Sequence, residues 1–201
     1  MSRSMTSTQL RTETQASAPY LRPALGLALL ILIGFGLLYS LIATGITAAL
    51  FPQQASGSLV TVHGQIIGSA LVAQPFTDQR YFQPRPSGCD YDPMKASGSN
   101  QARSNPDLLK RLAQTRHDVA VRDHVSENSV ADDLITQSGS GLDPEISLAA
   151  ALQQEARVAQ SRGLAVARVH RVVRDLAVED VLHLSQPRVN VLELNRSLDR
   201  L

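Results

Sequence analysis

The chain begins with a polar segment and continues into a long apolar run. From Pro23 to Phe51, 29 consecutive residues include no charged side chain. As an α-helix this run would be about 43 Å long, which exceeds the ~30 Å hydrocarbon core of a bilayer. The apolar part of a signal peptide is shorter, about 7–15 residues. The pattern therefore predicts one membrane-spanning helix, assigned to residues 23–48, and an export signal is the alternative.

After residue 51 the apolar positions fall into short patterned segments. Residues 58–62 and 65–72 are rich in Val, Ile and Leu and flank His63-Gly64, a combination that predicts a β-hairpin. Residues 75–105 are dense in Pro, Gly, Ser, Asn and Asp, and no regular structure is predicted there. Because aromatic side chains are spaced through this stretch, we expect an ordered surface loop that offers a surface for a partner.

The rest of the chain is rich in helix-start signals and in apolar residues at helical spacing. Asn105-Pro106 and Asp143-Pro144 each combine a capping residue with a proline, which predicts that a helix begins at each pair. The predicted helices cover residues 106–121, 144–163 and 165–176, and a strand at 187–191 leads into a last short helix. No aromatic residue follows Tyr91, so the core must consist of Leu, Val, Ile and Ala. The fold class is therefore α+β, with one membrane helix followed by a single mixed domain at residues 52–201.

Basic residues are distributed unequally around the apolar run. Arg3, Arg11 and Arg22 precede it, and the first basic residue after it is Arg80. The positive-inside rule then places residues 1–22 in the cytoplasm, as a tail expected to be disordered, and residues 52–201 outside. The outer part holds 16 Lys and Arg against 17 Asp and Glu. This near-neutral balance excludes a nucleic-acid-binding protein, which needs a strongly basic surface.

The sequence lacks the motifs of catalytic and metal sites. It contains no phosphate-binding loop, no G-x-S-x-G, no H-E-x-x-H and no C-x-x-C, and its five histidines share no metal-like spacing. Cys89 is the single cysteine, so no intramolecular disulfide is possible. The glycine-rich segment from Ser138 to Gly141 could hold an anion on backbone N–H groups. No basic residue lies near it in sequence, however, and a simple loop with a helix cap is the other interpretation.

Taken in order, several segments resemble the C subunit of the Kdp-type potassium-transporting ATPases. They are G-x-x-x-G-S-x-L-x-x-Q-x-F at 64–76, Y-F-x-x-R-P-S at 81–87, Y-x-P at 91–93, S-N-P-x-L at 104–108, T-x-S-G-S-G-L-D-P-x-I-S at 136–147, Q-x-x-R-V-A at 154–159 and Q-P-R-V-N-V-L-E-L-N at 186–195. The resemblance covers essentially everything after the N-terminal tail. The chain departs from the pattern in a shortened S-G-S-N at 97–100 and in the glycine-free segment 178–185.

The resemblance implies a subunit of an ATP-driven potassium pump in the bacterial inner membrane, not an enzyme by itself. Its partners would be a channel-like ion-selecting subunit, a P-type ATPase subunit and a small single-span subunit. Members of this family are thought to stabilise the assembly. They have also been described as catalytic chaperones that raise the ATP affinity of the ATPase subunit. A third possibility is a membrane-anchored periplasmic binding domain.

The chaperone version implies a nucleotide site, although no cofactor is expected on this subunit alone. A glutamine is implicated in the family, and Gln154 is the best match, with Ser138, Gly139, Ser140 and Gly141 as the glycine-rich element that would contact ATP. The residues themselves argue against direct contact, because the predicted outer domain faces away from cytoplasmic ATP.

Two regions are predicted to hold the partner subunits. Gly26 and Gly34 are eight positions apart and fall on neighbouring directions of an α-helix, where small residues allow another membrane helix to approach. Tyr81, Phe82 and Arg85 in the long loop are residue types that anchor interfaces. The alternatives are that the two aromatic residues pack on their own domain and that the glycines face lipid.

Overall fold

The computed structural model describes residues 18–180, 182 and 184–201. The chain forms two compact units, residues 1–55 and 56–201, which are described separately. The predicted disordered tail lies outside the described residues up to position 17. Residues 18–22 belong to a helix, so this part of the tail prediction is wrong.

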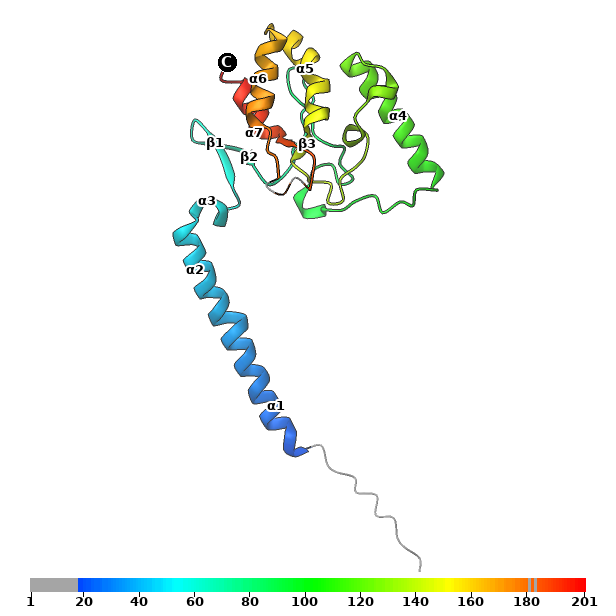
Figure 1. Cartoon of the computed structure of the whole chain (residues 1–201). Coiled ribbons are helices and arrows are strands. Elements are labelled where there is room, and N and C mark those ends of the chain that lie inside the picture. Colours follow the sequence, from blue (N-terminus) through cyan, green and yellow to red (C-terminus); the bar gives the residue numbers. More distant parts are fainter. Residues whose placement is uncertain (1–17, 181, 183) are drawn as a thin grey trace, which may run out of the picture. The chain divides into compact units, whose positions relative to one another are not determined.

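The first unit is one long apolar helix followed by a short one (Figure 1). It runs through α1 (Ala18–Ile31), a π-helical stretch (Leu32–Tyr39) and α2 (Ser40–Leu50), and α3 (Pro52–Ala55) follows. The continuous part from Tyr20 to Leu50 has a mean hydropathy of 2.5 and no buried residue in its most apolar window. Its length and composition are those of a helix that crosses a membrane.

The π-helical stretch changes the predicted directions of the two glycines. A π-helix bonds i to i+5 and turns by a different angle per residue from an α-helix. Gly26 lies in α1 and Gly34 in the π-helical stretch, so their relative direction cannot be calculated from 3.6 residues per turn. A Cβ placed at either glycine has no neighbouring atom within 4 Å, so both positions are open to a partner helix.

The second unit begins with the predicted hairpin. Strands β1 (Leu59–Val62) and β2 (Gln65–Ser69) pair antiparallel, with a bulge between Val60 and Thr61. His63 and Gly64 both have left-handed backbone angles, with φ of 49° and 79°. Two such residues make the tight turn whose twist matches that of the strands, which explains the glycine at this position.

Three of the predicted helices are confirmed close to their expected bounds. They are α4 (Pro106–Asp123), α6 (Val166–Leu176) and α7 (Val191–Leu198). Asn105 caps α4 by accepting a hydrogen bond from the backbone N–H of Asp107 at 2.9 Å. The loop before α4 has regular structure only in one 3₁₀ turn, Pro93–Lys95. The prediction of a long, ordered, irregular segment is therefore confirmed.

The predicted start of the middle helix is wrong. Asp143 does not cap a helix, because residues after it form strand β3 (Glu145–Ser147), which pairs antiparallel with β4 (Arg188–Asn190). Helix α5 (Leu148–Arg162) begins only after that strand, with Ser147 as its cap. The cap-and-proline signal was overridden because the backbone of residues 145–147 finds its partners in a strand more than 40 residues away in sequence.

The core lies between α5, α6, α7 and the small β3–β4 sheet, with α4 on one side (Figure 1). As predicted, its side chains are almost entirely aliphatic, and the most buried include Ile146, Val158, Val169, Val173, Val189 and Leu194. Among the described residues, Phe82 of the long loop is the fully buried aromatic side chain of this core, and the partly buried Phe76 packs against it.

Candidate functional site

The segment Gln79–Arg85 crosses the domain without joining a sheet, and helix side chains bond its backbone instead. Asn195 of α7 accepts from the N–H of Phe82 at 2.8 Å and donates to its carbonyl at 2.9 Å. Gln154 of α5 does the same for Gln83, at 2.9 and 3.2 Å. Paired bonds of this kind satisfy a buried strand-like backbone that has no neighbouring strand.

Two arginines of α5 complete this arrangement. Arg157 Nη1 donates to the carbonyls of Gln79 and Tyr81 at 2.6 and 3.0 Å. Arg162 Nε donates to the carbonyl of Arg80 at 2.7 Å. We call the four side chains that hold the segment, Gln154, Arg157, Arg162 and Asn195, the loop clamp. Two of the sequence blocks, Q-x-x-R-V-A and the one ending in V-L-E-L-N, supply three of its four members.

Gln154 has no hydrogen-bonding capacity left for a ligand. Its side chain is fully buried. Its Oε1 accepts from Gln83 N–H and from Arg157 Nη2 at 2.7 Å, and its Nε2 donates to the carbonyls of Gln83 and Ala150. An amide side chain has two donor hydrogens and two acceptor lone pairs, and all four are used. Gln154 is thus engaged within its own domain, and its role toward a nucleotide stays a prediction.

A buried ion network is joined to the loop clamp through Arg157. The Asp123 carboxylate is fully buried and accepts from Arg157 Nε at 2.8 Å, from Arg122 Nε and Nη2 at 2.9 and 2.7 Å, and from Gln153 Nε2 at 2.9 Å. Burial alone would raise the pKa of Asp123, but the hydrogen bonds and charges of the two arginines outweigh it and lower that pKa. Burial lowers the pKa of Arg157, which Asp123 partly offsets. The network fixes the Arg157 guanidinium in the direction of the loop.

The glycine-rich segment Ser138–Gly141 packs against the long loop. A Cβ added at Gly141 would lie 2.7 Å from Cys89 Sγ and 2.9 Å from the Ser97 carbonyl, and one at Gly98 would lie 2.8 Å from the Gly139 carbonyl. Gly141 also has a φ of +73°. Glycine is thus required here for close backbone approach and for a left-handed conformation. Gly139 and Ser140 remain exposed, while Ser138 and Gly141 are buried.

A basic side chain does lie beside this segment in space, although none is near it in sequence. Arg85 Nη1 pairs with Asp143 at 3.1 Å, and its Nη2 approaches Thr136 Oγ1 at 3.4 Å. Arg85 is therefore bound within its own domain, and it joins the loop to the glycine-rich segment. Gln154 does not contact this segment through any of its hydrogen bonds, because it belongs to the loop clamp. The residues predicted for nucleotide contact therefore lie in two separate sets of contacts, the glycine-rich segment and the loop clamp.

The three loop residues predicted to dock on a partner have three different environments. Phe82 is fully buried in the core, so its predicted docking role is wrong: the packing alternative holds for this side chain. Arg85 has a side chain only 26% exposed and engaged by Asp143. Tyr81 is half-buried and borders a cavity, and of the three it is the residue that remains placed for contact with another molecule.

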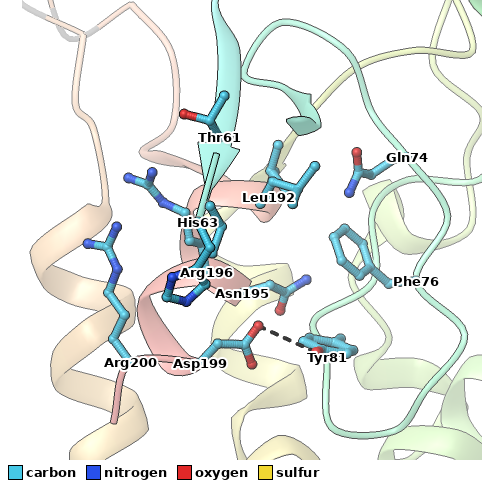
Figure 2. Close-up of a pocket in the computed structure, with 12 residues that line it drawn as sticks. Thr61, His63, Gln74, Phe76, Tyr81, Leu192, Asn195, Arg196, Asp199 and Arg200 are labelled. Atoms are coloured by element: carbon cyan, nitrogen blue, oxygen red, sulfur yellow. Dashed lines mark hydrogen bonds between the residues drawn. The ribbon is translucent and has the colours of Figure 1, made fainter. Parts of the chain in front are cut away.

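This hairpin cavity has a volume of about 580 Å³ and lies between β1, β2, the loop and the end of α7 (Figure 2). Tyr81 and Phe76 form one wall, with ring centroids 5.4 Å apart. The Tyr81 hydroxyl donates to Asp199 at 3.4 Å, and Arg162 lies over the Tyr81 ring at 5.0 Å. No sequence signal marks this cavity, because α7 lies more than 100 residues along the chain from the hairpin and the loop that form its other walls.

Within the described part of the chain, no group of three or more His, Cys, Asp or Glu is placed to hold a metal ion. A second hollow of about 400 Å³ borders Arg85 and carries acidic side chains, including Asp132, Asp143 and Glu145. The described part of the domain thus consists of internally bonded loops around an aliphatic core, and the hairpin cavity is larger than this second hollow.

Comparison with known proteins gives a consistent match. The family described as K+-transporting ATPase, c chain, matches residues 21–200. A protein of Xanthomonas oryzae pv. oryzae named potassium-transporting ATPase KdpC subunit is 59% identical over 181 residues, which are 90% of this chain and 87% of the relative. Proteins of the same name are 58% identical in Xanthomonas axonopodis pv. citri, over 90% of this chain and 88% of the relative, and 42% identical in Shewanella putrefaciens, over 98% of both.

Proposed function

The chain belongs to the C-chain (KdpC) family of potassium-transporting ATPases, and we propose that it is the accessory subunit that stabilises the assembly of such a pump. In this role it anchors through the apolar helix and binds the ion-selecting and ATP-hydrolysing subunits without performing chemistry itself. The family match, which extends from residue 21 to residue 200, supports membership of the complex.

One observation carries the choice of an assembly role over direct nucleotide binding. The Gln154 amide is fully buried, and its four hydrogen-bonding positions are occupied by Gln83, Arg157 and Ala150. A ligand that needed this amide would first have to break the loop clamp, at a cost of about 1–3 kcal/mol for each buried group left unpaired. A catalytic-chaperone role would therefore have to act indirectly, through contacts with the ATPase subunit and not through this amide.

The experiment that tests this proposal compares pumps purified with and without this chain. We expect the other subunits to dissociate or to be recovered in much lower yield when the chain is absent. Recovery of the intact complex without the chain, with only the KM for ATP raised, would contradict the assembly role and favour the chaperone. Addition of ATP to the purified chain in detergent should leave its unfolding midpoint unchanged.

We also propose that the N-terminus is cytoplasmic and that residues 52–201 lie outside the cytoplasmic membrane. Arg3, Arg11 and Arg22 on the N-terminal side, against none before Arg80 on the other, support this orientation. Cys89 is a poor reporter because it is only 8% exposed. Met94, which is 90% exposed, is a better site for a probe.

A labelling experiment distinguishes the two orientations. In a Cys89→Ser background, Met94→Cys should react with a membrane-impermeant thiol reagent in intact spheroplasts. A matched Ser4→Cys variant should react only after lysis. The reverse pattern would place the outer domain in the cytoplasm.

A further inference from the structure

We propose that the hairpin cavity receives a segment of another subunit of the pump, one that presents an apolar side chain next to a carboxylate. The inference rests on the proposed function, because it supposes that the chain assembles with other subunits. It adds the place of one contact and the chemistry of the partner that fits it.

Several apolar side chains line the cavity. Val62 and Ile67 of the hairpin line it. Phe76 of the loop and Leu192 of α7 also line it (Figure 2). Its volume of about 580 Å³ lies within the range of about 300–1,000 Å³ that is usual for binding cavities. Because it opens to solvent in the isolated chain, apolar surface remains in contact with water that an inserted side chain would cover.

Among the Arg, Asp and Glu residues that line the cavity, Arg200 is the one without an ion-pair partner in the described part of the chain. Asp199 is neutralised by Arg162, whose Nη2 lies 2.8 Å from its Oδ1. Arg196 pairs with Glu193 through Nη2, while its Nε has no hydrogen-bond acceptor among the described residues. Arg200 also lines the cavity and forms no ion pair in the described part of the chain. The local balance therefore favours a ligand group with a single negative charge.

This balance argues for a protein carboxylate rather than a phosphate of a lipid headgroup. Basic clusters bind phosphates when several unpaired Lys or Arg converge. Here the Asp199 carboxylate lines the same cavity, and two of the nearby arginines are already paired. A single carboxylate beside an apolar side chain fits Arg200 and the walls without displacing either ion pair.

The exposed side of the hairpin extends the apolar surface beyond the cavity. Ile66, which is 63% exposed, lies directly across the strand pair from Thr61, and Thr61 lines the cavity. Leu71 just after the hairpin is 62% exposed. Exposed apolar side chains beside a cavity favour a protein interaction site. In sequence, the hairpin follows the membrane helix by only eight residues.

The test uses the complete pump in native membranes. A photo-crosslinking amino acid is placed at Thr61, whose exposed side chain borders the cavity, and at Arg171 on α6 as a control. We expect an adduct between position 61 and another pump subunit, and none from position 171. An adduct only with lipid, or no adduct from position 61, would overturn the inference.

Substitutions give an independent measurement of the same contact. Thr61→Trp should fill the cavity, and Arg200→Glu should repel the carboxylate, so each should lower the recovery of the other subunits about tenfold, as expected for an interface hot spot. Gln65→Trp on the same hairpin outside the cavity, and Arg171→Glu, are the matched controls and should leave recovery unchanged. Full recovery with both test variants would refute the contact but leave the assembly role intact. Failure of the unmodified chain to co-purify with the pump would instead refute the assembly role itself.

Discussion

Replacement of Gln154 by alanine is the sharpest test of the interior role assigned to this residue. The substitution removes the acceptor of the Gln83 N–H, the donor to the Gln83 carbonyl and an acceptor of Arg157 Nη2. Each buried polar group that loses its partner costs about 1–3 kcal/mol, and the half-buried position of Gln83 lets water recover part of this. We therefore expect the free energy of unfolding of the outer domain to fall by about 3–6 kcal/mol.

That loss is a large share of the total stability, since whole domains are stable by about 5–15 kcal/mol. For a domain of this size it corresponds to a decrease in the unfolding temperature of about 10–20 °C. The assay is unfolding of the full chain in detergent, followed by the near-UV circular dichroism of its tyrosines. Two of them, Tyr81 and Tyr91, lie in the long loop and report on its packing.

Hydrogen exchange locates the effect within the domain. The amide of Gln83 should lose protection in the variant, whereas that of Phe82, held by Asn195, should lose less. Gln160→Ala is the control, because Gln160 is an exposed residue of the same helix. If Gln154→Ala unfolds within about 1 kcal/mol of this control, which is smaller than the cost of even one buried unpaired group, the clamp argument is wrong.

Three further predictions concern other parts of the molecule. Because the pKa of Asp123 is lowered in the folded protein, its contribution to stability is fully present above the ordinary carboxylate pKa of 3.8 and is lost as the pH falls through the folded pKa. Urea midpoints measured from neutral to acid pH should therefore decrease once the pH is below 3.8, and they should decrease less in Asp123→Asn. Gly141→Ala should destabilise the domain by about 1–3 kcal/mol, because the added Cβ would collide with Cys89 and the φ of this residue is +73°. Gly139→Ala is the control: the space around its Cβ is open, so its thermal unfolding should be close to that of the unmodified chain. Gly34→Leu should reduce co-purification of the other subunits without changing the outer domain, and an equal effect from Gly45→Leu would show that no specific helix contact involves Gly34.

The local elements were largely predictable from the sequence because their signals are local. An uncharged run longer than a bilayer is thick can be identified by counting, and the helix it predicts is present from Ala18 to Leu50. Asn105 before Pro106 marked a helix start because both the cap and the missing proline N–H act within one turn. The same signal failed at Asp143, where pairing with a distant strand determined the backbone conformation.

The long loop shows what composition can and cannot predict. Its lack of regular structure was predicted from its proline and glycine content, and its order from its aromatic residues. Which of those aromatic side chains would be buried was not predictable. Phe82 and Tyr81 are adjacent, yet one is in the core and the other borders a cavity, because the backbone between them is held by Arg157 and Asn195 from two different helices.

The sequence by itself determined the membrane helix, the hairpin, most helix bounds and, through its ordered motifs, the family. These depend on interactions between residues that are neighbours along the chain or on a direct match of residue identities. Only the tertiary structure decided what the motif residues do. Gln154 lies 71 residues from the backbone it bonds and Arg85 lies 58 residues from Asp143, so their roles arise from contacts that no spacing in the sequence encodes. Hydrogen bonds have a reach of about 3 Å, and folding alone brings such distant groups within it.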